Sequence, residues 1–185
     1  MPADYLTIQG AIDAANAGDE VVIAAGTYLE NINFNGKAIS VRSTNPADPA
    51  VVAATIIDGQ KVGSVVSFQS GEGANSVLSG LTITGGDDWA GGGIFCEKSS
   101  PSITNNTISG NNADLGGGIS CAWSSSSITN NTISENSATN GGGGIYCYLS
   151  RLTISSNSIS GNITDYGGGI CCLESSPTIS NNTIN

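Results

Sequence analysis

The sequence predicts an all-β protein, a parallel β-helix with three strands per coil and about 25 residues per coil. From residue 91 the chain repeats a unit that opens with Gly-Gly-Gly-Ile. Its equivalent isoleucines recur at intervals of 25, 26 and 25 residues: Ile94, Ile119, Ile145 and Ile170. Within each unit, apolar and polar residues alternate, which is the period of a strand rather than a helix. A repeat of this length indicates stacked coils that bury their apolar faces against one another.

An N-terminal cap is expected over residues 1–20. Thr7 is a suitable N-cap for a short helix that ends near Gly18. Its apolar residues fall on one face: Ile8, Ala11, Ile12 and Ala15. Such an amphipathic helix would cover the opening of the first coil and its unpaired strand edge.

Residues 21–90 are expected to form irregular coils. Leu78 and Ile83 share the five-residue spacing of the later repeats, and Phe34 and Ile39 share it too, around Asn35-Gly36. Ile39 and Ile83 are 44 residues apart, and the apolar runs AVVAATII and VGSVVSF lie between them. This stretch is either two compressed coils or one coil with a long insertion.

Residues 91–185 form the regular repeats, with corners predicted from Asn and Gly. A column of asparagines separates the second strand of each repeat from the third, where the side chains would cap the turn and hydrogen-bond along the stack. Its members are Asn106, Asn131, Asn157 and Asn182. The glycine runs at 91–93, 116–118, 142–144 and 167–169 predict tight corners with positive φ. A phosphate-binding loop is disfavoured there, because a strand follows each run and no Lys is near.

Composition excludes several functions. Five Lys+Arg stand against fifteen Asp+Glu, giving a net charge of −10, so a nucleic-acid partner is not expected. Without His, a Ser-His-Asp site and a His-ligated metal site are ruled out. No window approaches 18 consecutive apolar residues, so no membrane span is expected. No cofactor or metal is expected.

The run DYLTIQGAIDAANAGDEVVIAAGTYLENI, followed by GGGI…SPTISNNTI repeats, resembles right-handed parallel β-helix proteins of the pectin-lyase-like superfamily, secreted bacterial and archaeal members in particular. The resemblance covers essentially the whole chain, 1–185, as a single domain. It implies an extracellular or cell-surface location. It does not fix the activity, since that superfamily holds polysaccharide lyases, glycoside hydrolases, adhesin modules and proteins with no known activity.

An aromatic strip is the candidate binding site. Phe95, Tyr146 and Tyr148 alternate with the buried columns of the first strand, and Trp123 ends the neighbouring strand. Aromatic faces stack on sugar rings, so these four residues are the candidate site for a polysaccharide. The competing interpretation is that they are scattered exposed aromatics or are covered by loops.

A catalytic site is not expected, because no carboxylate pair is built into the repeat. Asp87 and Asp88 beside Trp89 are interpreted as a solvated loop, with a weak Ca²⁺ contact as the alternative. The predicted function is therefore a non-catalytic extracellular module with a structural or surface role. A polysaccharide lyase or glycoside hydrolase is the alternative.

A third hypothesis, ice binding, rests on two hydroxyl columns along the third strand, which are equally explained by strand propensity and solubility. They comprise Thr82/Thr84, Thr107/Ser109, Thr132/Ser134, Ser158/Ser160 and Thr183.

The cysteines follow the repeat. One per coil is expected to be a buried thiol that acts as a small apolar side chain: Cys96, Cys121, Cys147 and Cys172. Cys171 falls in the outward column and is the candidate reactive thiol.

The two ends of the sequence lead to two further predictions, a longer parent protein and self-association. The sequence starts at the cap without a signal peptide, as a mature or excised domain would, and it stops inside a coil. We therefore expect a longer parent protein. The final coil, with Ile179 and Ile184, has no recognisable cap, so self-association through it is predicted.

Overall fold

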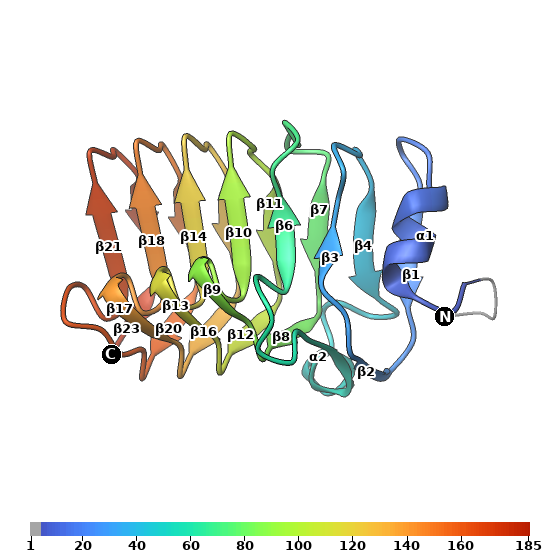
Figure 1. The fold of residues 1–185 in the computed structure, drawn as a ribbon, viewed down its shortest axis with the longest axis horizontal. Helices are drawn as coiled ribbons and strands as arrows, with labels where there is room; N and C mark the ends of the chain where they lie inside the picture. Colours follow the sequence, from blue (N-terminus) through green and yellow to red (C-terminus); the bar gives the residue numbers. More distant parts are fainter. Residues whose placement is uncertain (1–4) are drawn as a thin grey trace.

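The computed structural model describes residues 5–185, and these form a solenoid of stacked parallel strands (Figure 1). The first four residues of the predicted cap lie outside the described residues. Three long sheets run along the stack, and we number them by the order of their strands within the repeat. The fold class predicted from the sequence is confirmed, including its three principal strands per coil and its coil length near 25 residues.

Each long sheet takes one strand from each of six or seven coils. The first sheet contains β3 (Ile32–Asn33), β6 (Val66–Phe68), β10 (Ile94–Glu97), β14 (Ile119–Ala122), β18 (Ile145–Tyr148) and β21 (Ile170–Leu173). The second contains β1 (Glu20–Ile23), β4 (Ser40–Ser43), β7 (Val77–Ser79), β11 (Ser102–Thr104), β15 (Ser127–Thr129), β19 (Thr153–Ser155) and β22 (Thr178–Ser180). The third contains β2 (Gly26–Tyr28), β5 (Thr55–Asp58), β8 (Thr82–Thr84), β12 (Thr107–Ser109), β16 (Thr132–Ser134), β20 (Ser158–Ser160) and β23 (Thr183–Ile184).

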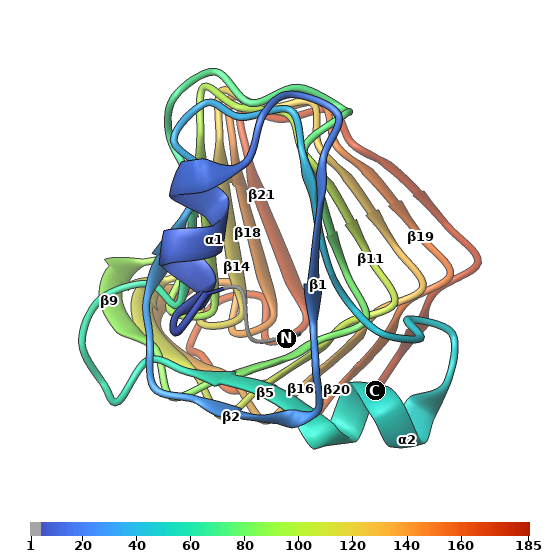
Figure 2. The same cartoon turned by 90° about the vertical axis from the view of Figure 1, so that its right-hand side faces the viewer.

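A fourth, shorter sheet was not predicted. It consists of β9 (Asp87–Ala90), β13 (Asn112–Leu115) and β17 (Ser137–Gly141), which run between the third strand of one coil and the first strand of the next. It lies beside the first sheet at one corner of the solenoid (Figure 2).

The core follows from the register. Equivalent residues of neighbouring coils pair directly, for example Ile94 with Ile119 and Ile108 with Ile133. These isoleucines are fully buried, and burying each one contributes about 1.5–3 kcal/mol. The interior is therefore a set of apolar columns parallel to the solenoid axis.

The helix α1 (Ile8–Ala14) caps the N-terminal end as predicted (Figures 1 and 2). Thr7 Oγ1 accepts a hydrogen bond from the Gly10 amide at 3.0 Å, and the Glu30 carboxylate accepts two more from the Ile8 and Gln9 amides. The helix buries Ile8 and two neighbours against the first coil, so its apolar face becomes the end wall of the core.

The stretch between Ile39 and Ile83 is one coil with long insertions. Val41 of β4 pairs with Leu78 of β7, 37 residues later, and no other strand of the second sheet comes between them. Within the run AVVAATII, the first residues belong to the helix α2 (Pro49–Ala54) because Asp48 caps it and Pro49 occupies its first turn.

The predicted equivalence of Phe34 and Ile39 to the second and third strands is wrong. Phe34 follows β3 in the first sheet, and Val41 continues the second-strand column. The reason is the length of the coil. Val21 pairs with Val41, so the first coil has only 20 residues, and the 25-residue period of the later repeats does not apply to it.

Two asparagine columns hold the corners. In the predicted column, the Asn131 side chain donates to Asn157 Oδ1 and to the Ile103 carbonyl, and its own oxygen accepts from the Asn106 amide. The left-handed residue is the one before each of these, such as Asn105 or Asn130, rather than the column itself. A second column stands before the glycine corners, at Asn111, Asn136 and Asn162.

Candidate functional site

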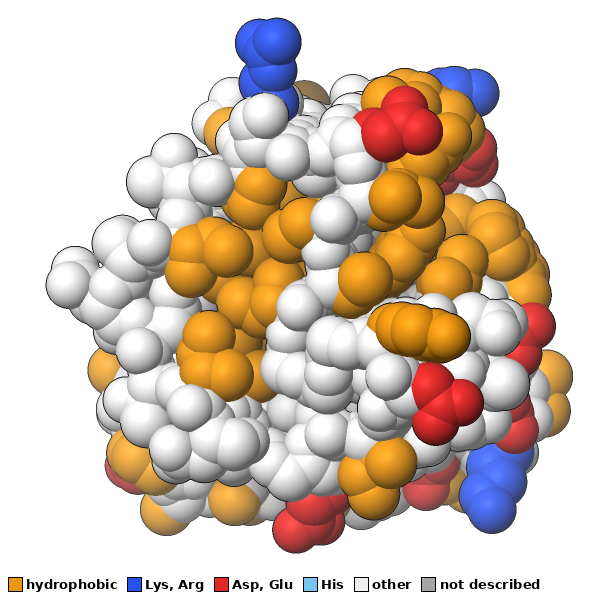
Figure 3. Space-filling view, turned by 90° about the vertical axis from the view of Figure 1, so that its left-hand side faces the viewer, with side chains coloured by type: hydrophobic (Ala, Val, Ile, Leu, Met, Phe, Trp, Pro, Cys, Tyr) orange, Lys and Arg blue, Asp and Glu red, His pale blue; other side chains and the backbone are white. Residues whose placement is uncertain are grey.

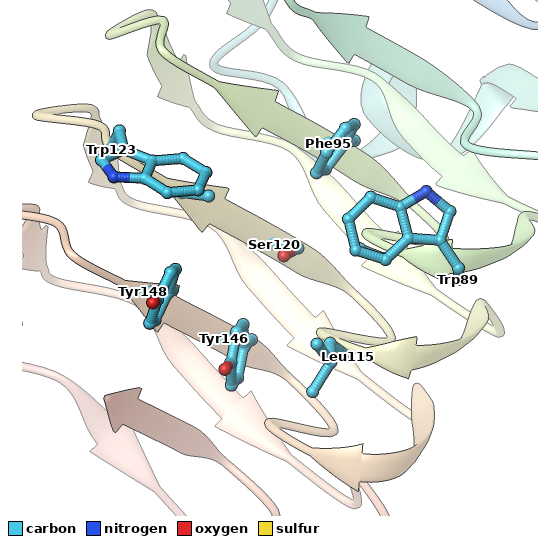
Figure 4. Close-up of a pocket in the computed structure, with 9 residues that line it drawn as sticks. Trp89, Phe95, Leu115, Ser120, Trp123, Tyr146 and Tyr148 are labelled. Atoms are coloured by element: carbon cyan, nitrogen blue, oxygen red, sulfur yellow. The ribbon is translucent and has the colours of Figure 1, made fainter. Parts of the chain in front are cut away.

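An aromatic cleft of about 260 Å³ opens on the outer face of the first sheet, where the fourth sheet adjoins it (Figure 4). Three neighbouring coils contribute its walls and floor. Its lining consists of Trp89, Ala90, Phe95, Leu115, Ser120, Ala122, Trp123, Tyr146 and Tyr148.

The glycine corners make this close arrangement possible. Gly116 has a φ of 66°, but Gly118 is needed for a different reason: a Cβ there would lie 2.6 Å from the Gly144 carbonyl oxygen of the next coil. Only the first glycine of each run has positive φ, so the prediction of left-handed corners holds for that position alone. The tight corner turns the chain directly from β13 into β14, which places Leu115 beside the aromatic residues.

The floor of the cleft is β14, whose outward residues are small. Ser120 pairs with Phe95 of β10 on one side and Tyr146 of β18 on the other. Ala122 pairs likewise with Glu97 and Tyr148. A strand with small side chains between two strands with large ones leaves a trough that runs along β14.

One wall is built from Phe95 and Trp89. The two rings meet edge to face with centroids 5.4 Å apart, a favourable aromatic geometry. Phe95 is only 5% exposed because Trp89 of β9 covers it, whereas Trp89 itself is 62% exposed. Trp89 therefore presents the accessible ring of this wall.

The opposite wall is built from Tyr146 and Tyr148, with Trp123 at the end of the trough. Trp123 and Tyr148 also meet edge to face, with centroids 5.4 Å apart, and Trp123 is 49% exposed. Burial raises the pKa of Tyr146, and the thiol of Cys171 nearby adds to the effect. Tyr146 therefore stays a neutral hydroxyl donor at pH 7.

The four predicted residues Phe95, Trp123, Tyr146 and Tyr148 thus gather around one cleft, although the expected strip is a trough and Phe95 is nearly buried. Sequence reasoning missed Trp89 and Leu115. A signal was present: both precede a glycine corner, Leu115 directly and Trp89 by two residues.

Asp87 and Asp88 lie in the strand β9, so the prediction of a loop is wrong, although Asp87 is exposed to solvent as expected. Asp88 accepts hydrogen bonds from the amide and hydroxyl of Ser64 at 2.8 and 2.9 Å, and Asp87 accepts one from Asn112. Both carboxylates therefore connect β9 to neighbouring segments. Among residues 5–185, no three His, Cys, Asp or Glu side chains gather where they could hold a metal ion.

The cysteine column is buried at Cys96, Cys121 and Cys147 but not at Cys172, which is exposed, so the expectation of four buried thiols is wrong at its last member. A hydrogen bond with the Cys147 thiol lowers the pKa of Cys172 to about 7. Cys171, the predicted reactive thiol, is only partly exposed, and burial raises its pKa.

The hydroxyl columns of the third sheet face outward, but α2 covers their N-terminal part. Thr82 donates to the Val52 carbonyl at 2.9 Å, and Val52 also lines a cavity of about 190 Å³ with Thr107 and Thr132. The flat array that ice binding requires is interrupted there.

Comparisons with known proteins bear on this fold. The family described as the right-handed beta helix region matches residues 31–185. The chain belongs to the right-handed β-helix family. The resemblance identified in the sequence is thereby confirmed at the level of the fold. No curated protein sequence matches this β-helix protein.

Two solved structures resemble this β-helix protein, both of the pectin methylesterase from Aspergillus niger, one in deglycosylated and one in penultimately deglycosylated form. Each has a TM-score of 0.49 at 12% identity, over 97% of this chain and 82% of the enzyme chain. At this similarity the comparison carries no information on activity.

Neither helix among the described residues is long and apolar enough to cross a bilayer.

Proposed function

We propose that residues 1–185 form a single β-helix module that works outside the cell or at its surface, without catalysis, and binds polysaccharide through the aromatic cleft. The observation that carries the proposal is the trough along β14, with its small floor and aromatic walls.

The geometry of the trough suits a sugar ring. Pyranoses present C–H groups on their faces and hydroxyls on their edges, and the C–H faces pack on aromatic rings. Trp89 and Trp123 offer exposed rings at opposite ends of the trough, and the Tyr146 and Tyr148 hydroxyls can hydrogen-bond to sugar hydroxyls.

The size of the cleft points to recognition of one or two sugar units. Its volume of about 260 Å³ lies just below the range of about 300–1,000 Å³ typical of drug-sized ligands. Leu115 and Trp89 close one end of the trough and Trp123 closes the other. A chain end or a side branch of a polysaccharide fits this shape better than the middle of a straight polymer.

The decisive experiment is titration calorimetry against a panel of oligosaccharides, with Trp123→Ala and Tyr148→Ala as test variants. Loss of one stacking ring should weaken binding by about 1–2 kcal/mol, or roughly five- to thirtyfold. Tyr166→Ala is the matched control, because Tyr166 is 70% exposed and lies outside the cleft. Equal affinity in all three variants would refute the proposed site.

The rival function is a polysaccharide lyase or glycoside hydrolase. It predicts turnover, so assays for new reducing ends and for unsaturated uronates should accompany the titrations. Turnover that disappears in an acid-to-amide variant would replace the binding proposal with an enzymatic one.

A further inference from the structure

The charges around the aromatic cleft point to its ligand class. Resting on the function proposed above, we propose that the cleft selects uncharged sugar units over uronates, and that Glu97 sets this selectivity.

The cleft holds no charged side chain among its lining residues. Of the five Lys and Arg residues of the chain, Lys98 lies beside the cleft, with its Nζ 5.6 Å from the centroid of the Trp123 ring. Two others are engaged elsewhere, since Lys37 donates to backbone carbonyls near α1 and Arg42 pairs with Glu20.

Glu97 stands at the edge of the trough. It follows Phe95 by two residues on β10, so its side chain is on the same outer face, and it pairs with Ala122 of the floor. Its Oε1 lies 4.0 Å from Lys98 Nζ. The cation beside Trp123 is therefore already faced by a carboxylate.

A uronate in this trough would lose hydration without gaining a cationic partner. Burying a carboxylate against apolar rings is costly unless an opposite charge compensates; the lining offers neutral hydroxyls, and none of the described lining residues is a cation. The nearby Glu97 repels it, and the net charge of −10 adds a long-range term. A neutral sugar incurs neither cost and keeps the same ring stacking.

The test compares hexagalacturonate with its fully methyl-esterified form, which has the same sugars and linkages without the charge. Neutral xylohexaose, mannohexaose and cellohexaose complete the panel. We expect hexagalacturonate to bind at least about tenfold more weakly than the ester or the best neutral hexaose at low salt. The difference should shrink as salt is added, because exposed charges are screened.

Glu97→Lys provides a gain-of-binding test. It should raise the affinity for hexagalacturonate by about tenfold and leave neutral sugars nearly unchanged. Glu135→Lys, at the corner after β16, makes the same change in net charge away from the trough, so it should leave the affinities for hexagalacturonate and for neutral sugars nearly unchanged. Thermal unfolding of both variants verifies that they are folded.

The outcomes separate the two proposals. If hexagalacturonate binds as well as its ester or better, the proposed selectivity for uncharged sugars is wrong, but the proposed binding of glycans is supported. If Glu97→Lys behaves like Glu135→Lys, the assignment of Glu97 is wrong. If no sugar of the panel binds at millimolar concentration, the proposed function fails and the selectivity fails with it.

Discussion

Two residues show how position in the stack decides side-chain chemistry. Cys172 continues the column of Cys147, yet it is exposed because β21 is the outer strand of its sheet. Glu72 is the opposite case, a carboxylate only 2% exposed. It accepts hydrogen bonds from the Gly36 and Ser70 amides and from the Ser99 hydroxyl. The repeat pattern predicts neither the exposure of Cys172 nor the burial of Glu72, because each residue has surroundings that no other coil repeats.

Cys172 should be the first thiol of this chain to react. With a pKa of about 7 it is largely thiolate at pH 8, so a polar alkylating reagent should modify it before Cys171. Mass spectrometry of briefly labelled, folded protein measures this order. Cys172→Ser should leave slow labelling at Cys171 and none at Cys121 until denaturation. Fast reaction at Cys171 would contradict the structure.

Glu72 should make stability depend on pH. Burial alone would raise its pKa, but hydrogen bonds from Gly36, Ser70 and Ser99 outweigh burial and lower the pKa. A carboxyl whose folded pKa is below its unfolded value stabilises the fold above the unfolded pKa, near 4.3, and loses that stabilisation as the pH falls through the folded pKa.

Glu72→Gln should therefore cost about 2 kcal/mol at pH 7 and flatten the acid limb of the stability profile. Urea unfolding at pH 7 and at pH 3 measures both effects. Glu135→Gln, at an exposed site, is the control. A profile unchanged by Glu72→Gln would show that this carboxylate does not stabilise the fold.

At the scale of the element, the regular coils could be predicted and the irregular ones could not. Three strands per coil follow from apolar columns in one register, and α1 follows from Thr7 and its apolar face. The helix α2 was missed because its residues AVVA also fit a buried strand. The fourth sheet was missed because β9 begins with two acids, which favour loops, and its pairing partners lie a coil away.

The candidate site also has a part that could be predicted from the sequence and a part that could not. Its residues on the first sheet share the repeat register, so the sequence placed Phe95, Tyr146 and Tyr148 on one face. Trp89 comes from the fourth sheet, and its contact with Phe95 depends on the path of the chain around a corner. Such a contact across a corner does not recur with the repeat period, so the sequence pattern could not predict it.

The asparagine column should stabilise the corners measurably. Asn131→Ala removes donors to Asn157, Ile103 and Thr129 and leaves the Asn106 amide without its acceptor. We expect a loss of about 2–4 kcal/mol, measured by thermal and urea unfolding.

Asn130→Gly is the matched control for this corner. It changes the adjacent left-handed residue, with φ of 57°, to one that adopts this conformation freely, so stability should stay the same or rise slightly. Equal loss in both variants would mean that the corner, not the side-chain column, is what Asn131→Ala disturbs.

The whole molecule has unlike ends. One is covered by α1, whereas the other shows apolar side chains in the described chain (Figure 3). Ile179 and Ile184 are 46% and 48% exposed there, and β21, β22 and β23 are the outermost strands of their sheets. Unpaired strand edges with apolar neighbours favour association with another copy.

The 185-residue chain should therefore form end-to-end dimers at high concentration. Two identical ends make a closed, isologous contact, whereas α1 obstructs propagation from the other end. Light scattering over a concentration series should show a dimer for the native chain and a monomer for Ile184→Lys. Val62→Lys, also at an exposed apolar residue, is the control. A native chain that stays monomeric at millimolar concentration would exclude the dimer.

Because the cleft is shared among three successive coils, the proposed binding depends on the order of those coils, whereas the fold does not. Duplicating one 25-residue unit would lengthen the solenoid by about 4.8 Å and leave every column intact. If the copy were inserted beside β14, however, it would move the Phe95 wall away from the Tyr146 wall by one strand spacing. The fold should therefore tolerate the gain or loss of a coil, except among the three coils that carry the proposed binding site.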